Sequence, residues 1–217
     1  MLVRDYMTRH PLLADSEMTI VEAQRYMGEN KVRHLPVVGD GKRLLGLITR
    51  QTLLIDPGRL GSLDLWEIAR TLSRMAVKDV MVKAKDVITI DPDCTIESAA
   101  QLMVERKIGC LPVLEEGIVA GILTEADLLA HLTEMLATRV PGVRVTMRMP
   151  DQKGELAKLV SAISGQGWGI MALGGAPSPR DPAKWDAVVK ICDVPRDDIV
   201  AALAQVEGQQ IIDVREN

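Results

Sequence analysis

Two short stretches of the chain combine residue types that suit the binding of an anion. Each is an apolar run that starts at a glycine, reaches a threonine and passes into a helix-like pattern, at 121–127 and at 46–52. A turn from strand to helix leaves backbone N–H groups unpaired at the positive end of the helix dipole. Such a turn suits a phosphate group or a ribose hydroxyl.

The second stretch ends in Thr124 and Asp127, and this spacing has two interpretations. The two side chains form a helix capping box, or they bind a ligand, and one protein can use them for both. The first stretch has Thr49 and, in place of the aspartate, Thr52. A threonine lacks the charge-assisted hydrogen bond of a carboxylate. We therefore expect one good site at Thr124 and Asp127 and a second site, weak or empty, at Thr49 and Thr52.

Both stretches belong to an internal repeat. Four blocks recur in the same order 74 to 76 positions later: 3–7 with 77–81, 19–27 with 95–103, 35–38 with 111–114, and 46–49 with 121–124. The small changes in spacing fall in segments that read as loops, where insertions are tolerated. Repeated blocks of this kind indicate a duplicated structural unit.

Each copy reads as β-α-β-β-α. Apolar residues at Ile20, Ala23 and Met27 follow the spacing of one helix face, and their counterparts in the second copy do the same. Thr19 and Glu22 have the spacing of a capping box at the start of the first helix. The sequence thus predicts repeat 1 at 1–55, a bridging amphipathic helix at 56–75, repeat 2 at 76–136 and a hinge at 137–142.

From residue 143 the pattern changes. Residues 143–149 alternate apolar and polar side chains, as a half-buried strand does. The elements expected after it complete the order β-α-β-β-α-β over 143–217, which is the ferredoxin-like plan. The whole chain is therefore predicted to be an α+β protein, with two repeated units followed by a third, smaller domain.

Composition limits the function. A net charge of −4 argues against a nucleic-acid surface, and the lack of a long apolar run argues against a membrane span. We expect a cytoplasmic protein. The three cysteines and three histidines are scattered, which predicts no metal site. No motif of a catalytic nucleophile, P-loop or dinucleotide site is present, so we expect no enzyme.

The repeated motifs resemble a known family. The apolar-Pro-Val runs at 35–38 and 111–114, each followed by a glycine-to-threonine stretch, resemble a tandem pair of CBS domains, or Bateman module, over roughly residues 1–135. Residues 143–217 resemble an ACT domain, with 150–156 matching its first strand-to-helix loop. This combination is similar to the acetoin-utilisation AcuB-like proteins of bacteria. The resemblance implies two repeats related by a pseudo-twofold axis.

The resemblance also implies a ligand. CBS pairs commonly bind adenosine ligands between the repeats: AMP, ADP or ATP, and less often S-adenosylmethionine. By position, Asp127 would accept hydrogen bonds from the ribose, Thr124 would hold ribose or phosphate, and Arg33 and His34 would contact phosphate. The residues that would enclose the base are Thr89, Leu111, Pro112 and Val113. Arg33 and His34 are equally compatible with solvated surface groups.

For the third domain, the ACT resemblance implies an amino acid bound near Asp151 and Gly154. Gly154 has a second interpretation, since a glycine in such a turn often only supplies a positive φ. We expect a non-catalytic regulatory protein without an obligatory cofactor. It would sense an adenine nucleotide, and its third domain would bind a second ligand or form a homodimer. The alternative is a structural dimerisation scaffold whose clefts stay empty.

Overall fold

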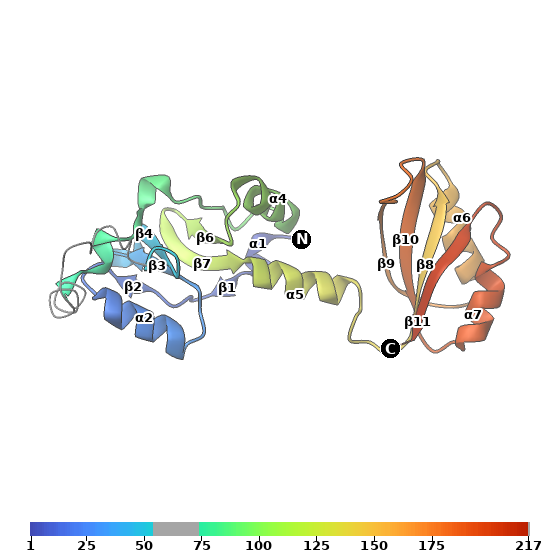
Figure 1. Ribbon diagram of the computed structural model, residues 1–217, viewed down its shortest axis with the longest axis horizontal. Coiled ribbons are helices and arrows are strands. Elements are labelled where there is room, and N and C mark those ends of the chain that lie inside the picture. The colour runs from blue at the N-terminus through green and yellow to red at the C-terminus, as the bar shows by residue number, and fades with distance from the viewer. Residues whose placement is uncertain (54–73, 217) are drawn as a thin grey trace, which may run out of the picture. The chain divides into compact units, whose positions relative to one another are not determined.

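The computed structural model describes residues 1–53 and 74–216. The chain divides into two compact units, Met1–Leu128 and Leu129–Asn217 (Figure 1). The bridging helix predicted at 56–75 falls almost entirely outside the described residues, as does the helix expected to follow Thr52.

The first unit holds both copies of the repeat, except that the last helix of the second copy, α5, continues beyond Leu128. The elements of the first copy are α1 (Val3–Tyr6), β1 (Thr8–Arg9), β2 (Ala14–Asp15), α2 (Ile20–Glu29), β3 (His34–Val38), η1 (Asp40–Lys42) and β4 (Leu44–Thr49). Those of the second copy are η3 (Val77–Asp79), β5 (Val82–Lys83), η4 (Ala84–Asp86), α4 (Ile96–Arg106), β6 (Cys110–Glu115), β7 (Ile118–Thr124) and α5 (Glu125–Met135). The strand expected around Thr89 is reduced to a single parallel bridge between Ile90 and Val113.

The helix faces read from the sequence are confirmed. Ile20, Ala23 and Met27 of α2 are buried, and so are the corresponding residues of α4. The capping box at Thr19 and Glu22 is also confirmed, because the Thr19 hydroxyl accepts from Glu22 N–H and the Glu22 carboxylate accepts from Thr19 N–H at 2.9 Å. The amphipathic pattern thus fixes which side of each helix covers its sheet.

The two copies exchange their first segments. One sheet has the order β2-β3-β4-β5, and the other has the order β1-β7-β6. Thr8 of β1 lies opposite Ile122 of β7, and Lys83 of β5 lies opposite Gly46 of β4. The first segment of each copy therefore completes the sheet of the other, although the sequence repeat divides the chain into two consecutive blocks.

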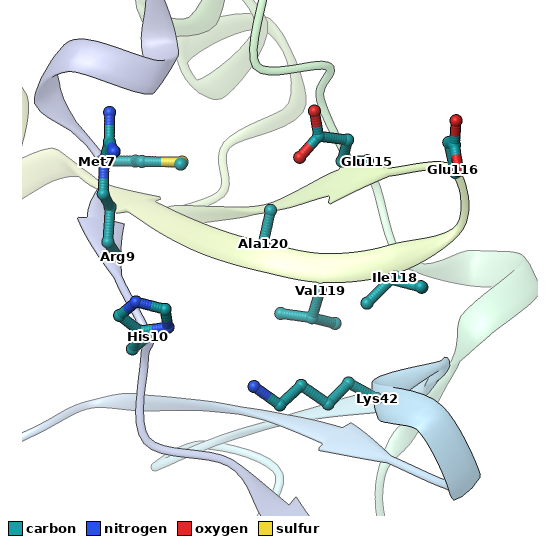
Figure 2. A pocket seen from close by; sticks show the side chains of 9 residues that line it. All are labelled: Met7, Arg9, His10, Lys42, Glu115, Glu116, Ile118, Val119 and Ala120. Atoms are coloured by element: carbon teal, nitrogen blue, oxygen red, sulfur yellow. The ribbon is translucent and has the colours of Figure 1, made fainter.

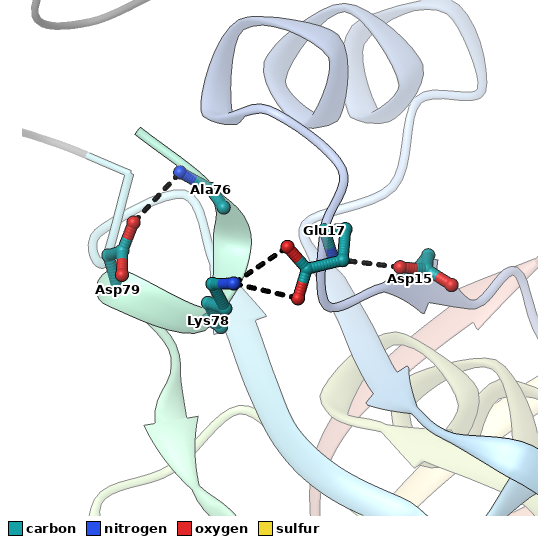
Figure 3. A network of polar contacts seen from close by, with 5 residues as sticks. All are labelled: Asp15, Glu17, Ala76, Lys78 and Asp79. Atoms are coloured by element: carbon teal, nitrogen blue, oxygen red, sulfur yellow. Dashed lines mark hydrogen bonds and ion pairs between the residues drawn. The ribbon is translucent and has the colours of Figure 1, made fainter. Parts of the chain in front are cut away.

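The hydrophobic cores follow this exchange. Val3 is fully buried among Ala99, Met103 and other residues of the second copy. Val77 is equally buried among residues of the first copy. On the surface, the Lys78 ammonium lies 2.7 Å from the Glu17 carboxylate, so η3 is also tied to the segment before α2 (Figure 3). Each copy depends on the other for part of its core.

The second unit is a four-stranded antiparallel sheet with two helices. Its elements are β8 (Val143–Pro150), α6 (Glu155–Gly165), β9 (Ile170–Pro177), β10 (Lys184–Ile191), α7 (Arg196–Leu203) and β11 (Gln210–Glu216). The strands lie in the order β11-β8-β10-β9. Leu159 of α6 and Leu203 of α7 pack in one core with Val145 of β8, so both helices cover the same face (Figure 1).

Candidate functional site

The turn between β7 and α5 is held by Thr124 and Asp127. The backbone N–H and the hydroxyl of Thr124 both donate to Asp127 Oδ2, at 2.8 and 2.7 Å. Asp127 N–H donates in turn to Thr124 Oγ1 at 3.3 Å. This is a capping box, and it uses only one of the two carboxylate oxygens. Oδ1 makes no hydrogen bond to any residue that the structure describes, and a carboxylate oxygen is a strong acceptor for a ligand hydroxyl.

The equivalent turn after β4 is closed differently. Thr49 N–H donates to Thr52 Oγ1 at 2.9 Å, and Thr52 N–H donates to Thr49 Oγ1 at 3.2 Å. The Thr52 hydroxyl donates its only proton to the carbonyl oxygen of Thr49 at 3.0 Å. Thr52 therefore reproduces the cap without a charge and without an unused donor.

A cleft of about 280 Å³ lies beside Thr124 in the first unit. The described residues that line it are Thr8, His10, Pro11, Leu12, Lys31, Val32, Arg33, His34, Ile122, Thr124 and Ala126. Its lining includes Lys31, Arg33 and two histidines but no carboxylate, so its polar side suits an anion. Leu12, Val32 and Ile122 supply an apolar side. Asp127 follows directly after the lining residue Ala126.

A second cleft, of about 360 Å³, lies beside Thr49. Its charged lining residues are Arg33, Arg50, Asp86, Lys107 and Glu125. Arg33 and His34 line both clefts, which places them at the boundary between the two. The two clefts thus differ in charge, since only the second has carboxylates in its lining.

His34 is half-buried between these clefts. Burial lowers the pKa of its imidazole below the usual value, and the neighbouring Arg33 lowers it further, while Glu125 opposes both. These effects favour the neutral imidazole of His34 in the protein without a ligand. An anion placed beside it would favour the imidazolium and so raise this pKa.

Cys110 lines the second cleft but is not an activated nucleophile. Its side chain is buried at the start of β6, opposite Thr124 in the ladder. Burial, assisted by the Glu125 carboxylate, raises the pKa of the thiol to about 12. A thiol needs a lowered pKa to react at neutral pH.

The residues expected to enclose a base are not all brought to one place. Thr89 lies next to Ile88, which lines the cleft beside Thr49. The described residues that line the cleft beside Thr124 do not include Leu111, Pro112 or Val113. Leu111 and Val113 are instead fully buried in the core of the second copy. Thr124, Arg33 and His34 do line a common cleft.

Sequence reasoning missed the segment 8–12, which lines the cleft beside Thr124. It lies there because β1 pairs with β7. The similarity of 3–7 to 77–81 identified the two segments as equivalent. Sequence similarity does not show which sheet each segment joins. That choice depends on tertiary packing.

A larger pocket, of about 560 Å³, shares His10 with the cleft beside Thr124 (Figure 2). Arg9, His10 and Lys42 line it together with Glu115 and Glu116 of the turn between β6 and β7. Figure 2 shows Lys42 extending from η1 below β7, while the two glutamates lie at the end of the β6–β7 hairpin. Its mixed charge gives it no preference for an anion.

In the second unit, the loop between β8 and α6 contains Asp151 and Gly154. Both residues are exposed, and Asp151 N–H donates to the carbonyl oxygen of Ala183 at 3.0 Å. Gly154 is the N-cap of α6 with a φ of +92°, and no atom lies within 4 Å of the position of a Cβ. The backbone conformation alone accounts for a glycine here.

Across 1–53 and 74–216, no group of three or more His, Cys, Asp or Glu side chains is placed to hold a metal ion. None of the helices in the described part of the chain has the length and apolar character needed to cross a membrane.

Comparison with known proteins places these clefts in context. The family model of the CBS domain matches residues 3–55 and 77–134, about half of the chain. An uncharacterised 33.4 kDa protein of the ribosomal RNA operon of Thermofilum pendens is 32% identical over 146 residues, 66% of this chain and 46% of that protein. The chain thus spans about half the length of this curated relative.

Two solved structures resemble a large part of the chain. One is a Vibrio cholerae protein assigned to acetoin utilization (AcuB), with 29% identity and a TM-score of 0.54, covering 64% of this chain and 95% of that chain. The other is CBSX2 in complex with AMP, with 26% identity and a TM-score of 0.51, covering 60% of this chain and 95% of that chain.

Proposed function

The chain belongs to the CBS-domain family, and we propose that its CBS pair binds an adenine nucleotide in the cleft beside Thr124. The observation that carries the proposal is the Thr124–Asp127 cap, which leaves one carboxylate oxygen unused next to a cleft lined by cations. The AMP complex of the similar protein CBSX2 supports the choice of ligand class.

In this proposal, different groups of the cleft hold the ribose, the phosphates and the base of the nucleotide. The Asp127 carboxylate accepts hydrogen bonds from the ribose hydroxyls, and the Thr124 turn holds ribose or phosphate. Arg33, Lys31 and His34 hold the phosphates, because an Arg fork and a His that can gain a proton suit an oxyanion. Leu12, Val32 and Ile122 replace Leu111, Pro112 and Val113 as the apolar enclosure of the base. The cleft beside Thr49 is the weaker site.

The protein acts as a regulator and not as a catalyst. A nucleotide that contacts both copies favours the arrangement in which both sets of contacts form. It can shift the equilibrium between two arrangements only by its difference in affinity for them, typically about 1–3 kcal/mol.

We assign the second unit to an ACT-like domain, supported by its β-α-β-β-α-β order and by the turn at Gly154. It would bind an amino acid near Asp151 and Gly154 or pair with a second chain. A homodimer is favoured by the exposed apolar side chains of Leu129, Leu132 and Met135, which share one stripe of α5. A link to acetoin utilisation is part of the same proposal, supported by the AcuB likeness.

The alternative is a dimerisation scaffold with empty clefts. The Thr52 hydroxyl already donates its proton to the Thr49 carbonyl oxygen, which favours an empty cleft beside Thr49. Isothermal titration calorimetry of the full chain with AMP, ADP, ATP and S-adenosylmethionine separates the two functions. The regulator predicts saturable binding of at least one of the three nucleotides. The scaffold predicts no heat of binding with any of the four ligands.

A further inference from the structure

Three cations form a row across the sheet of the second unit. Lys190 of β10 lies directly opposite Arg144 of β8, and Arg144 lies directly opposite Arg215 of β11. These residues alternate with Val189 and Val145 of the core, so they occupy the face that α6 and α7 do not cover. Like charges at directly opposite positions destabilise a sheet unless something compensates them.

The Asp213 carboxylate accepts hydrogen bonds from two members of this row. Asp213 Oδ2 accepts from Arg144 Nη1 at 3.3 Å, and Asp213 Oδ1 accepts from Arg215 Nε at 2.8 Å. The neighbouring pair on the same face differs, since Arg148 and Asp186 form two hydrogen bonds of 2.7 and 2.8 Å with each other. Among the residues that the structure describes, the row therefore has three positive groups and one carboxylate partner, Asp213.

Lys190 is the member without a partner. Its side chain is only 2% exposed, and its Nζ makes no hydrogen bond or ion pair within the part of the chain that the structure describes. A lysine normally extends its stem so that the ammonium reaches water. A buried ammonium with no partner is costly, because it loses its hydration without gaining an interaction.

The residue that follows α5 lies against the same face. Ala172 of β9, the ladder partner of Lys190, is buried. Leu136, which follows α5, lies 3.5 Å from the position of a Cβ at Gly174, two residues along β9. Ala137 is buried as well. Leu136 thus lies against the Lys190 face of the sheet at β9, the strand paired with β10.

We propose that this row is a binding site for an oxyanion, the phosphate or carboxylate group of a small metabolite. Lys190 would supply a desolvated ammonium, and Arg144 would supply the guanidinium N–H groups that Asp213 does not use. The site lies at the Val143 end of β8, whereas Asp151 and Gly154 follow its other end. Because the row and the nucleotide cleft share no residue, this proposal is independent of the proposed function.

Thermal unfolding of the full chain, followed by tryptophan fluorescence, tests the site. A Trp66→Phe background leaves Trp168 and Trp185, both in the second unit, as the reporters. Sodium phosphate and sodium succinate are each compared with sodium chloride at equal ionic strength. At least one of the two oxyanions is expected to raise the midpoint by about 2–4 °C through preferential binding to the folded state. The anion that gives the larger rise identifies the group as phosphate or carboxylate.

Lys190→Met keeps the length of the side chain and removes its charge. This variant should lose the oxyanion-dependent rise and should unfold no earlier than the parent in chloride. Lys184→Met, on the same strand and face, should keep the rise, and Arg144→Gln should reduce it. The proposal is overturned if neither oxyanion raises the midpoint of the parent, or if Lys190→Met keeps the rise.

Discussion

Asp127 and Thr52 occupy equivalent positions in the two copies and close equivalent turns, yet they leave different chemistry at the cleft. Asp127 caps with Oδ2 and keeps Oδ1 unused, whereas the Thr52 hydroxyl gives its proton to the Thr49 carbonyl. We propose that this side chain, together with the different charges of the two clefts, makes the cleft beside Thr124 the stronger nucleotide site.

Thr52→Asp should convert the weaker cleft into a second site. An aspartate can accept from Thr49 N–H as Thr52 now does, and its other oxygen would be available to a ribose. Calorimetric titration with AMP should show the stoichiometry rising from one to two per chain. Thr52→Asn, which offers an acceptor without a charge, is the matched control and should stay at one. A Thr52→Asp variant that still binds one AMP would contradict the assignment of this position.

His34 should make nucleotide binding depend on pH. Burial and Arg33 hold its pKa below the usual value in the free protein, and a phosphate beside it would raise that pKa. Binding then takes up a proton, so AMP affinity should increase as the pH falls from about 8 through the usual histidine pKa of about 6.5. His34→Gln should remove this dependence. An affinity that stays constant over this range in the wild type would mean that His34 does not contact the phosphate.

The same shift has the opposite effect on stability. The pKa of His34 is lower in the folded than in the unfolded chain. Protonation of His34 therefore costs no unfolding free energy above the unfolded pKa of about 6.5. Stability decreases as the pH falls toward the folded pKa, since the unfolded state binds the proton first. Chemical unfolding of the ligand-free protein at pH 7.5 and 5.5 should therefore show a larger loss in the wild type than in His34→Gln.

At the scale of elements, the exchanged strands depend on two glycines. A Cβ at Gly46 would lie 2.5 Å from the Val82 carbonyl oxygen, and one at Gly121 would lie 2.5 Å from Met7 Sδ. These glycines allow β5 and β1 to approach the sheets that they join. A rigid backbone carbonyl yields less than the end of a methionine side chain.

Gly46→Ala should therefore destabilise the protein by about 1–3 kcal/mol, and Gly121→Ala by less. Urea unfolding with unchanged m-values would measure both. Gly28→Ala is the control, because a Cβ there meets nothing within 4 Å on helix α2. It should stabilise by about 0.5–1 kcal/mol. Equal stabilities for all three variants would contradict the close approach of the exchanged strands.

Much of this element level could be predicted from the sequence. Periodicity at Ile20, Ala23 and Met27 located α2, and the Thr19–Glu22 spacing located its cap, since both signals are local. The exchange of β1 and β5 could not be predicted, because equivalent segments fit equivalent sheets and only packing decides between them. The buried Lys190 was missed for a related reason: on an alternating strand its position reads as an exposed face.

At the scale of the whole molecule, the exchange makes the two copies depend on each other. Val3, near the start of the first copy, is buried in the core of the second, and Val77 is buried in that of the first. A nucleotide bound beside Thr124 would contact segment 8–12 and β7, which belong to different copies in sequence but to adjoining strands in space.

Hydrogen exchange can detect this dependence. Val3→Ala should accelerate exchange mainly in β6 and β7, and Val77→Ala mainly in β3 and β4, with each cavity costing about 1–3 kcal/mol. Faster exchange confined to the copy that contains the mutated residue in sequence would contradict the exchanged arrangement.

The proposed nucleotide site depends above all on the Asp127 carboxylate, which is held by Thr124 and would bind the ribose. Its most direct test is the calorimetric affinity for AMP of the wild type, Asp127→Asn and Glu22→Gln. Glu22 is the matched control because its carboxylate caps α2 in the same way, but its chain neighbours Val21 and Ala23 line neither cleft, whereas Asp127 follows the lining residue Ala126. Asp127→Asn should weaken binding by about 1.5–3 kcal/mol, roughly tenfold to a hundredfold, while Glu22→Gln should bind like the wild type. Equal affinity in the wild type and Asp127→Asn would contradict this role of Asp127.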